Sequence, residues 1–451
     1  MKKFLILLVI VSLHVFILFK LIFFPYPELF IYPYLTDQGL LPYKQIFDQH
    51  FPGLMFLPIN LNNLGMTDEY IARWWLVGLV VFTHILLFLI SSKIFNDFKK
   101  AIFANLFYLI WQPFLEGWVL WIDSFLPMFL LPAFYFSYSF VNKGGLIKVF
   151  LAGLFLGMAL LFKQVVIPLA GLVFLLLLYY KKNINTVICF LAGFLPLPSL
   201  MVAYFWVIGV FREFWYWAVI FNLTTFAEHG RKFPFFTGVI RVVGIYFSVI
   251  GIPFLKDKKF AVTLLVFIIG SLSATFARFD FVHFQPSLPF VAIASCAILF
   301  KLWAKPKFRL LVIGYILITS LWLSIFYKGH IGGKVFFFDE NTKLIASKIK
   351  HYVNPKEEIF LFGPVLHLYQ MSNTLPAGKI FVFQFPWFIM ETEDRLIEAL
   401  RISSPKLIVR DRSVIIENQP IIEYAKKLDD HIEKNYYVNE KIGVTEFMLR
   451  K

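Results

Sequence analysis

The chain has 451 residues, of which 59% are hydrophobic, 20% aromatic and only 16% charged, and its mean hydropathy is +0.73. A soluble chain of this length could not bury so much apolar surface, so the composition excludes a water-soluble globular protein. The net charge of +15 does not indicate a nucleic-acid-binding protein, because the basic residues fall in short segments between apolar runs.

Apolar runs that are long enough to span a bilayer, about 17–25 residues each, recur over the first part of the chain. We predict a polytopic α-helical membrane protein with about eleven transmembrane helices. They cover residues 4–24, 71–92, 101–115, 117–140, 149–162, 164–180, 184–209, 237–255, 260–277, 286–303 and 310–326. The first run resembles a signal peptide, but Phe23-Phe24-Pro25-Tyr26 offers no small-residue cleavage site, so we interpret it as an uncleaved helix.

The charged residues between these runs alternate in a way that predicts the topology. If the N-terminus is cytoplasmic, the short loops on that side are basic, as the positive-inside rule expects. They contain Lys2, Lys3, Lys93, Lys99, Lys100, Lys143, Lys148, Lys181, Lys182, Lys256, Lys258, Lys259, Lys301, Lys305, Lys307 and Arg309. Of the acidic residues before 327, only Asp97 and Asp257 share that side. We therefore predict a multi-pass protein of the cell membrane with a polar outer face.

Two long loops and the C-terminal segment are predicted on that outer face. The loops cover about residues 25–70 and 210–236, and long ordered loops tend to carry function. From about residue 330, helix-like and strand-like stretches alternate. The helices are expected at 339–352, 391–402 and 418–434, and the strands at 359–362, 379–382 and 407–409. We predict a transmembrane domain at 1–329 and a small exported α/β domain at 330–451 with a largely parallel sheet.

The first outer loop contains two short motifs after Glu28, Gly39-Leu40-Leu41-Pro42-Tyr43 and Asp48-Gln49-His50-Phe51-Pro52. They resemble the first outer loop of the C-fold (GT-C) membrane glycosyltransferases. More narrowly, they are similar to the bacterial and archaeal branch related to the dolichyl-phosphate-mannose protein mannosyltransferases. The chain departs from that family where members often have adjacent Asp-Glu, because it has Pro27-Glu28. The acid that the resemblance implies is therefore either Glu28 or Asp48.

Three later segments agree with the same family in their order and in their side of the membrane. Asp123-Ser124-Phe125-Leu126 resembles the acidic start of a helix, and Leu161-Phe162-Lys163-Gln164 resembles a lysine-containing break at a helix end. The segment from Arg278 to Phe284, with His283, resembles the entry of a late helix. The resemblance implies transfer of a hexose or pentose from a polyprenyl-phosphate-linked donor to a protein, lipid or glycan acceptor, with membrane lipids as further partners.

The chemistry of such a transfer accounts for the types of these residues. A carboxylate is needed to deprotonate or orient the acceptor hydroxyl, and Glu28 and Asp48 are the catalytic candidates. Cations are needed to hold the departing phosphate, and Lys163, Arg278 and His283 are the candidates.

The other candidates are predicted to bind substrate. The resemblance implies that Tyr43 and His50 do so, and Asp123 would either hold a divalent metal or orient a base, so a metal cofactor stays open. The chain has no glycine-rich nucleotide-binding loop, and we expect neither a nucleotide cofactor nor a nucleic-acid partner. Cys189 and Cys296 lie inside predicted spans, so the exported parts have no disulfide framework.

Each candidate also has a purely structural explanation. Glu28 and Asp48 would be solvated loop acids, Lys163 would extend to the interface from a helix end, and Asp123 would pair with a neighbouring base. For the whole protein, the alternatives are a transporter or flippase, a membrane scaffold with an outer binding module, and an envelope polysaccharide ligase or polymerase. Transporters keep polar residues near the bilayer midplane and often show repeated halves, whereas this chain has neither feature.

Overall fold

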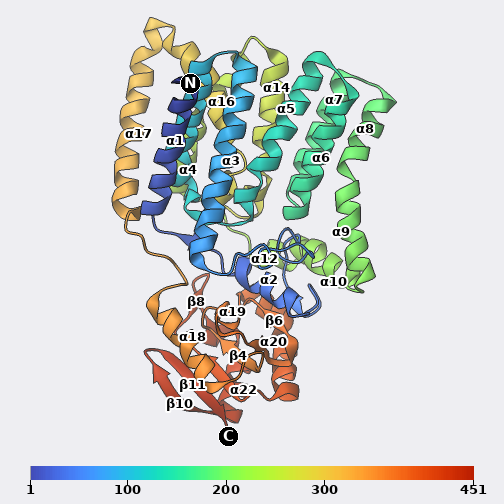
Figure 1. The fold of residues 1–451 in the computed structure, drawn as a ribbon, viewed down its shortest axis with the longest axis vertical. Coiled ribbons are helices and arrows are strands. Elements are labelled where there is room, and N and C mark those ends of the chain that lie inside the picture. Colours follow the sequence, from blue (N-terminus) through green and yellow to red (C-terminus); the bar gives the residue numbers. More distant parts are fainter. Residues whose placement is uncertain (1) are drawn as a thin grey trace. The chain divides into compact units, whose positions relative to one another are not determined.

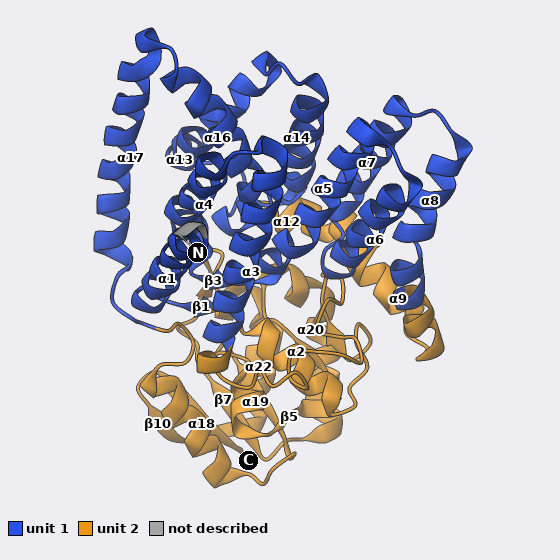
Figure 2. Cartoon of the chain, turned by 45° about the horizontal axis from the view of Figure 1, so that its top comes forward, with its two compact units in different colours: residues 1–24, 72–201, 232–334 blue, residues 25–71, 202–231, 335–451 orange. Residues whose placement is uncertain are grey.

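The computed structural model describes residues 2–451, except the side chains of Lys2 and Lys3, so these two predicted cytoplasmic lysines lie outside the described side chains. The chain folds into two compact units that are interleaved in sequence (Figure 2). Unit 1 comprises Met1–Phe24, Ala72–Met201 and Lys232–Lys334, and unit 2 comprises Pro25–Ile71, Val202–Arg231 and Val335–Lys451.

Unit 1 is built from helices that run alongside one another (Figure 1). Helices α3 and α9 begin in one unit and end in the other. The main helices are α1 (Lys2–Lys20), α3 (Glu69–Phe95), α4 (Phe98–Gln112), α5 (Pro127–Lys143), α6 (Leu146–Phe162), α7 (Val166–Tyr180), α8 (Ile184–Phe194), α9 (Pro196–Val207), α13 (Phe236–Tyr246), α14 (Lys258–Ser271), α15 (Ser273–Ala277), α16 (Leu288–Trp303) and α17 (Arg309–His330). Shorter elements are η1 (Pro113–Gly117), β3 (Val119–Leu120), η2 (Ile122–Phe125), η4 (Phe247–Phe254), η5 (Phe281–Phe284) and η6 (Pro306–Phe308).

Each of the predicted apolar stretches contains a helix or a pair of helices. Within the described residues, three helical segments are by themselves long and apolar enough to cross a membrane, namely Glu69–Phe95, Phe236–Phe254 and Pro306–His330. The pair α8 and α9 adds a fourth if its 44° bend is counted within one span. The remaining apolar helices are shorter, so the number of spans stays a prediction.

The predicted helix at 117–140 was wrong in its first part, because α5 begins only at Pro127. The chain leaves helical geometry before that point, and Glu116 adopts a left-handed conformation with φ of 57°. Pro127 suits a helix start, where its missing N–H would have no partner in any case. Asp123 consequently lies in the short turn η2 that precedes α5, and not on a membrane helix.

Helices α6 and α8 approach each other closely because glycines face the contact. A methyl group on Gly153 or Gly157 of α6 would collide with the backbone oxygens of Phe190 and Phe194, and one on Gly193 of α8 would collide with the α6 backbone. Small residues of this kind let membrane helices pack backbone against backbone. The close packing of α6 against α8 holds the helix whose C-cap residue is Lys163.

The lysine-bearing helix ends of unit 1 meet at one end of the bundle. Lys181 lies over the ring of Phe140, 5.5 Å from its centroid, and Lys259 lies 5.9 Å from the ring centroid of Tyr180. These contacts join the C-terminal ends of α5 and α7 to the N-terminal end of α14. They agree with the alternation of basic loops, while the side of the membrane that this end faces stays a prediction.

Unit 2 contains a five-stranded sheet with the strand order β10-β11-β7-β4-β5. Its elements in the C-terminal segment are α18 (Glu340–Tyr352), β4 (Glu358–Phe362), α19 (Leu368–Ser372), β5 (Leu375–Pro376), η7 (Ala377–Lys379), β6 (Phe381–Val382), α20 (Pro386–Ser403), β7 (Leu407–Arg410), β8 (Ile415–Ile416), β9 (Gln419–Pro420), α21 (Ile421–Tyr424), α22 (Lys426–Asn435), β10 (Tyr436–Ile442) and β11 (Thr445–Arg450). Strand β4 pairs in parallel with β5 and β7, but β11 is antiparallel to β7 and β10. The prediction of a largely parallel sheet was wrong for this C-terminal hairpin, whose short turn requires antiparallel strands.

The predicted outer loops fold together with the C-terminal segment in unit 2. They supply α2 (Glu28–Asp37), β2 (Ile46–Phe47), α10 (Phe211–Trp215), η3 (Tyr216–Ile220), α11 (Phe221–Leu223) and α12 (Thr225–His229), whereas β1 (Phe24–Pro25), which pairs with β3, begins in unit 1. Strand β2 pairs in parallel with β6, and the hydroxyl of Tyr34 on α2 donates to the carbonyl of Thr374 at 3.1 Å. The ring of Trp217 stacks on Phe47. Most of α2 is buried, so the first loop is an integral part of this unit. The predicted division of the chain at residue 330 stays a prediction.

Candidate functional site

Asp48 is the centre of a polar group in unit 2. The residue follows β2 and is only 1% exposed. The hydroxyl of Tyr32 donates to its Oδ2 at 2.7 Å, and the backbone N–H of His50 donates to its Oδ1 at 2.7 Å. The Nδ1 atom of His50 lies 2.9 Å from the same Oδ1. Both oxygens therefore accept hydrogen bonds, as suits a buried carboxylate.

The segment around His50 is held from several directions. The buried hydroxyl of Tyr43 donates to the carbonyl of His50 at 2.9 Å, and the side-chain amide of Asn222 donates to the carbonyl of Gln49 at 2.7 Å. Tyr43 has a left-handed backbone with φ of 62°, and its ring packs against Phe205 and other aromatic side chains. In this structure Tyr43 positions the segment, and its direct contact with a substrate stays a prediction.

Glu28 occupies the first turn of α2 and is 6% exposed. Its Oε2 atom is buried and has no hydrogen-bond partner among the described residues. Burial raises the pKa of this carboxyl to about 8, and the neighbouring negative charge of Asp48 acts in the same direction. Glu28 is therefore mostly protonated at neutral pH, whereas Asp48 is surrounded by donors.

A second polar group lies in unit 1, where three helix ends bring Asp123, Lys163 and His283 together. The ammonium of Lys163 lies 2.8 and 2.6 Å from the two carboxylate oxygens of Asp123. The Nδ1 atom of His283 lies 3.1 Å from Asp123 Oδ2 and 3.1 Å from Lys163 Nζ. All three residues are buried, so this network holds its charges away from water.

Arg278 and Lys232 lie beside this network and share Asp280. The Nε atom of Arg278 donates to Asp280 Oδ2 at 2.6 Å, and Lys232 Nζ donates to Asp280 Oδ1 at 2.8 Å. Burial alone would raise the pKa of Asp280, but the two cations hold it below its usual range. The N–H of His283 donates to the carbonyl of Asp280, so both groups are tied to the same turn.

Glu116 closes the same region from the turn between α4 and α5. Its Oε2 accepts a hydrogen bond from the N–H of Val282 at 3.0 Å. Burial, followed by the charge of Asp280, raises its pKa. The guanidinium of Arg241 lies over the rings of Phe114 and Phe281, at 3.9 and 4.1 Å from their centroids. Carboxyl and guanidinium groups thus border the turn that holds His283.

The structure assembles the predicted site residues in two sets. One set, in unit 1, consists of Asp123, Lys163, Arg278 and His283; the other, in unit 2, consists of Glu28, Tyr43, Asp48 and His50. Tyr32, Asn222 and Lys232 were not predicted as site residues from the sequence. Tyr32 could have been found, because it lies four residues after Glu28, a spacing that places two side chains on one helix face. Lys232 gave no local signal, since its partner Asp280 is distant in sequence.

Metal binding was left open by the sequence. Over residues 2–451, the structure brings no three or more His, Cys, Asp or Glu side chains together in an arrangement that could hold a metal ion. The two polar groups above are instead built from hydrogen bonds and ion pairs within the chain.

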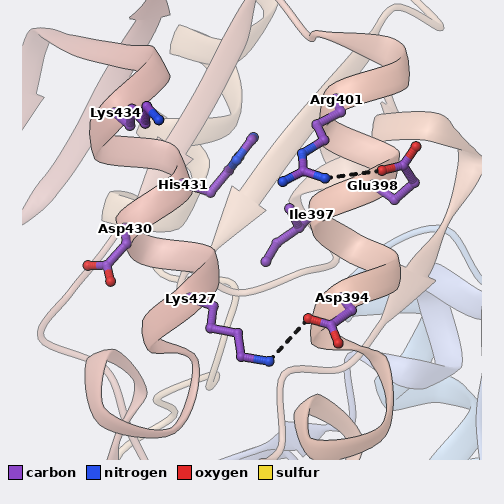
Figure 3. Close-up of a pocket in the computed structure, with 8 residues that line it drawn as sticks. All are labelled: Asp394, Ile397, Glu398, Arg401, Lys427, Asp430, His431 and Lys434. Carbon is purple, nitrogen blue, oxygen red and sulfur yellow. Dashed lines mark hydrogen bonds and ion pairs between the residues drawn. The ribbon is translucent and has the colours of Figure 1, made fainter.

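A third polar region is a surface groove of about 610 Å³ between α20 and α22 in unit 2 (Figure 3). Its lining residues are Asp394, Ile397, Glu398, Arg401, Lys427, Asp430, His431 and Lys434. Lys427 pairs with Asp394 at 3.2 Å, and Arg401 pairs with Glu398 at 3.5 Å (Figure 3). Exposed pairs of this kind contribute little, and the groove fits an ordinary solvated surface.

Comparisons with known proteins show similarity in the fold and not in the sequence. No family model matches the sequence, and no curated protein matches it. Among solved structures, the chain is similar to ArnT from Cupriavidus metallidurans bound to undecaprenyl phosphate, with a TM-score of 0.64, 12% identity, and coverage of 98% of this chain and 97% of that one. The chain has the GT-C glycosyltransferase fold.

The oligosaccharyltransferase of Archaeoglobus fulgidus, solved with a tethered acceptor peptide that contains the NVT sequon, is also similar, with a TM-score of 0.54 and 14% identity. The match covers 99% of this chain and 74% of that one. A further structure of this enzyme, AglB, contains an inhibitory peptide and a dolichol-phosphate, and matches at a TM-score of 0.54. The predicted GT-C fold is thus confirmed, and fold and apolar helices together indicate a membrane protein. The narrower resemblance to the mannosyltransferase branch stays a prediction.

Proposed function

We propose that this protein transfers a sugar from a polyprenyl-phosphate-linked donor to an acceptor at the outer face of the cell membrane. The observation that carries the proposal is the buried network of Asp123, Lys163 and His283, with Arg278 and Lys232 beside it. A structural ion pair needs no such concentration of cations at one end of the bundle. The sugar is a hexose or pentose, and the acceptor is a protein, a lipid or a glycan.

The cations of unit 1 suit the donor phosphate. Lys163, Arg278 and Lys232 carry three positive charges, while the ionised Asp123 and Asp280 carry two negative charges. The group therefore has an excess of positive charge, which favours a phosphate whose negative charge grows as the sugar leaves. Preformed pairs also fix the directions of the N–H donors before the donor lipid binds.

The polar group of unit 2 suits the acceptor. Tyr32, Asp48 and His50 place a buried carboxylate beside an imidazole and a phenol hydroxyl. Such a group can orient an acceptor hydroxyl and remove its proton while the anomeric carbon is attacked. Glu28, as a neutral carboxyl at pH 7, can donate a hydrogen bond to the sugar or the acceptor.

The fold supports the same assignment of substrate class. The two similar solved proteins are described with undecaprenyl phosphate and with dolichol-phosphate, and one of them with an acceptor peptide. Because this chain shares their fold over nearly its whole length, we propose a polyprenyl-phosphate donor for it as well.

We also propose a cytoplasmic N-terminus and an exported C-terminal segment. Three helices, α5, α6 and α16, each carry a residue of the Asp123–Lys163–His283 network at or next to one end and a lysine at the other. Together with the positive-inside rule, this arrangement supports a network at the outer face. Reporter fusions at residues 181 and 451 should give opposite signals, and matching signals would contradict this topology.

The function is tested by incubating the purified protein with a panel of sugar-loaded polyprenyl phosphates and an acceptor mixture. We expect release of free polyprenyl phosphate by the wild type and a large loss of release in Lys163→Ala. Lys148→Ala is the matched control, because Lys148 lies at the opposite end of the same helix. Movement of the lipid-linked sugar across a membrane without release of polyprenyl phosphate would overturn the proposal in favour of a flippase.

A further inference from the structure

Building on the proposed glycosyl transfer, we propose that Gln285 and Glu116 are positioning residues for His283. Neither side chain belongs to the Asp123–Lys163–His283 network. They tie the turn that carries His283 to the break between α4 and α5, and so hold the imidazole against the carboxylate and the ammonium. Their role is to keep the proposed phosphate-binding group assembled before the donor lipid binds.

Gln285 fastens this turn from its C-terminal side. The residue lies between η5 and α16 and is only 3% exposed. Its Nε2 atom donates to the carbonyl of Gln112 at 3.0 Å and to the carbonyl of Leu115 at 2.5 Å. Both carbonyls lie where α4 ends and the regular hydrogen bonding of a helix stops. A glutamine amide has two N–H donors, which is enough for both carbonyls.

Glu116 fastens the same turn from its N-terminal side. Its Oε2 atom accepts a hydrogen bond from the backbone N–H of Val282 at 3.0 Å. Arg241 adds a third contact, because its guanidinium lies over one aromatic ring of η1 and one of η5. Since Val282 and Gln285 flank His283 in the chain, the backbone on both sides of the imidazole is held by one segment. A side chain supported in this way keeps its direction.

The segment that receives these contacts is itself well fixed. The Nε2 atom of Gln112 donates to the carbonyl of Gly117 at 3.0 Å, and its Oε1 atom lies 3.0 Å from Nε2 of His14 on α1. A methyl group on Gly117 would collide with the side chain and the carbonyl oxygen of Gln112. The break between α4 and α5 is therefore a packed structure that is joined to a further helix, and it can serve as a fixed support.

His283 needs such a support because it contacts charged groups on two other elements. Its Nδ1 atom lies 3.1 Å from Asp123 Oδ2 and 3.1 Å from Lys163 Nζ. An outward displacement of the ring by about 1 Å would end both contacts, and a misplacement of that size can cost about 10²-fold in rate. Gln285 and Glu116 would thus act on sugar transfer through His283, whereas residues that merely stabilise unit 1 would act independently of it.

The test is a double-mutant cycle on the release of polyprenyl phosphate from a sugar-loaded donor by the purified protein. Gln285→Met keeps the approximate length and volume of the side chain but removes both N–H donors. We expect it to lower kcat/KM for the donor by about 10–10²-fold, and His283→Ala to lower it by about 10²-fold or more. The double variant should lie within about twofold of His283→Ala, because the two residues act through one group. Gln285→Glu, which turns acceptor oxygens toward the same carbonyls, should lose at least as much as Gln285→Met.

Ser295→Ala is the matched control, because it removes a buried hydrogen bond from the helix that follows the turn. The Oγ atoms of Ser295 and Ser248 lie 2.8 Å apart, farther along α16. This variant should lower the melting temperature and leave kcat/KM within about twofold of the wild type, since it acts on stability alone. A loss of kcat/KM in Ser295→Ala as large as that in Gln285→Met would reduce Gln285 to a general support of α16 and overturn the inference.

Thermal unfolding shows whether each variant folds. If Gln285→Met does not fold, the same cycle with Glu116→Met tests the support from the other side of the turn. With an active wild type, losses that multiply in the double variant overturn this inference alone, and so does full activity of the folded single variant. A wild type that releases no polyprenyl phosphate from any donor overturns the proposed function itself, and this inference with it.

Discussion

The buried carboxylates of the two units have different kinds of partner. In unit 1, Asp123 meets the positive charge of Lys163 within 2.8 Å, and Asp280 meets Arg278 and Lys232. In unit 2, Asp48 is satisfied by a hydroxyl, a backbone N–H and an imidazole, while the Oε2 atom of Glu28 has no partner among the described residues.

This difference indicates what each group can do. Paired charges in unit 1 hold each other in place, and a phosphate can join them without leaving any charge uncompensated. In unit 2, a hydroxyl, a backbone N–H and an imidazole supply the hydrogen bonds that a buried carboxylate needs. Changes in unit 1 should therefore affect stability and donor binding, and changes in unit 2 should affect turnover first.

The largest effect is expected for Asp123→Ala, because it leaves the ammonium of Lys163 buried without its carboxylate. Breaking one side of a buried pair typically costs about 3–5 kcal/mol, which thermal or denaturant unfolding would detect. The double variant Asp123→Leu with Lys163→Met should recover much of the lost stability and no activity. If Asp123→Ala unfolds like the wild type, the pair does not stabilise unit 1.

Lys163→Ala should lower polyprenyl-phosphate-dependent turnover by about 10²–10³-fold, as expected when one donor to a developing negative charge is lost. Arg278→Ala should act in the same direction, because its guanidinium also lies in the cation group. The measurement is kcat/KM for the lipid-linked donor, with Lys148→Ala as control. Equal losses in Lys163→Ala and Lys148→Ala would remove the phosphate role from this end of α6.

Glu28→Gln should change how stability depends on pH. The pKa of this carboxyl is 4.5 in the unfolded chain and about 8 in the folded protein. The carboxyl therefore stabilises the folded protein below pH 4.5, and this stabilisation is lost as the pH rises to about 8. The wild type should therefore lose stability between pH 5 and about 8 relative to Glu28→Gln, which does not titrate. Melting temperatures of both proteins over this range test the prediction. A constant difference between them would show that Glu28 does not titrate in that window.

The smallest effects concern two tyrosines of α2. Tyr32→Phe removes a hydrogen bond to the charged Asp48 and should cost about 1.5–3 kcal/mol. Tyr34→Phe removes hydrogen bonds to neutral partners, Asn373 and the carbonyl of Thr374, and should cost about 0.5–1.5 kcal/mol. Denaturant unfolding measures both. The reverse order would indicate that Tyr32 does not bind an ionised carboxylate.

The sequence was sufficient for the features that depend on composition along the chain. Apolar length located the helices, and the alternation of lysines correctly grouped helix ends such as those of α5, α7 and α14. Asp123 and Lys163 could be selected because ionisable groups next to apolar runs are costly and need a partner. That Asp123 and Lys163 pair with each other could not be derived, because the two residues lie far apart in the chain.

Other features depended on contacts that no local pattern encodes. The break between α4 and α5, with Glu116 in a left-handed conformation and α5 beginning only at Pro127, could not be predicted from a continuous apolar pattern. The pairing of β2 with β6 joins the first loop to a distant strand, and it explains why the loop folds as part of unit 2. The hydrogen bond that Tyr32 donates to the buried Asp48 could not be predicted either, because no local pattern identifies the carboxylate as its acceptor.

The most direct test of the account measures polyprenyl-phosphate binding and turnover in parallel for Lys163→Ala and Asp48→Asn. We expect Lys163→Ala to weaken binding of polyprenyl phosphate by at least about tenfold, because a charge-assisted contact is lost. Asp48→Asn should bind it within about twofold of the wild type and lose turnover by about 10²-fold or more. Equal effects of the two substitutions on binding, or full turnover by Asp48→Asn, would contradict the division of labour between the two polar groups.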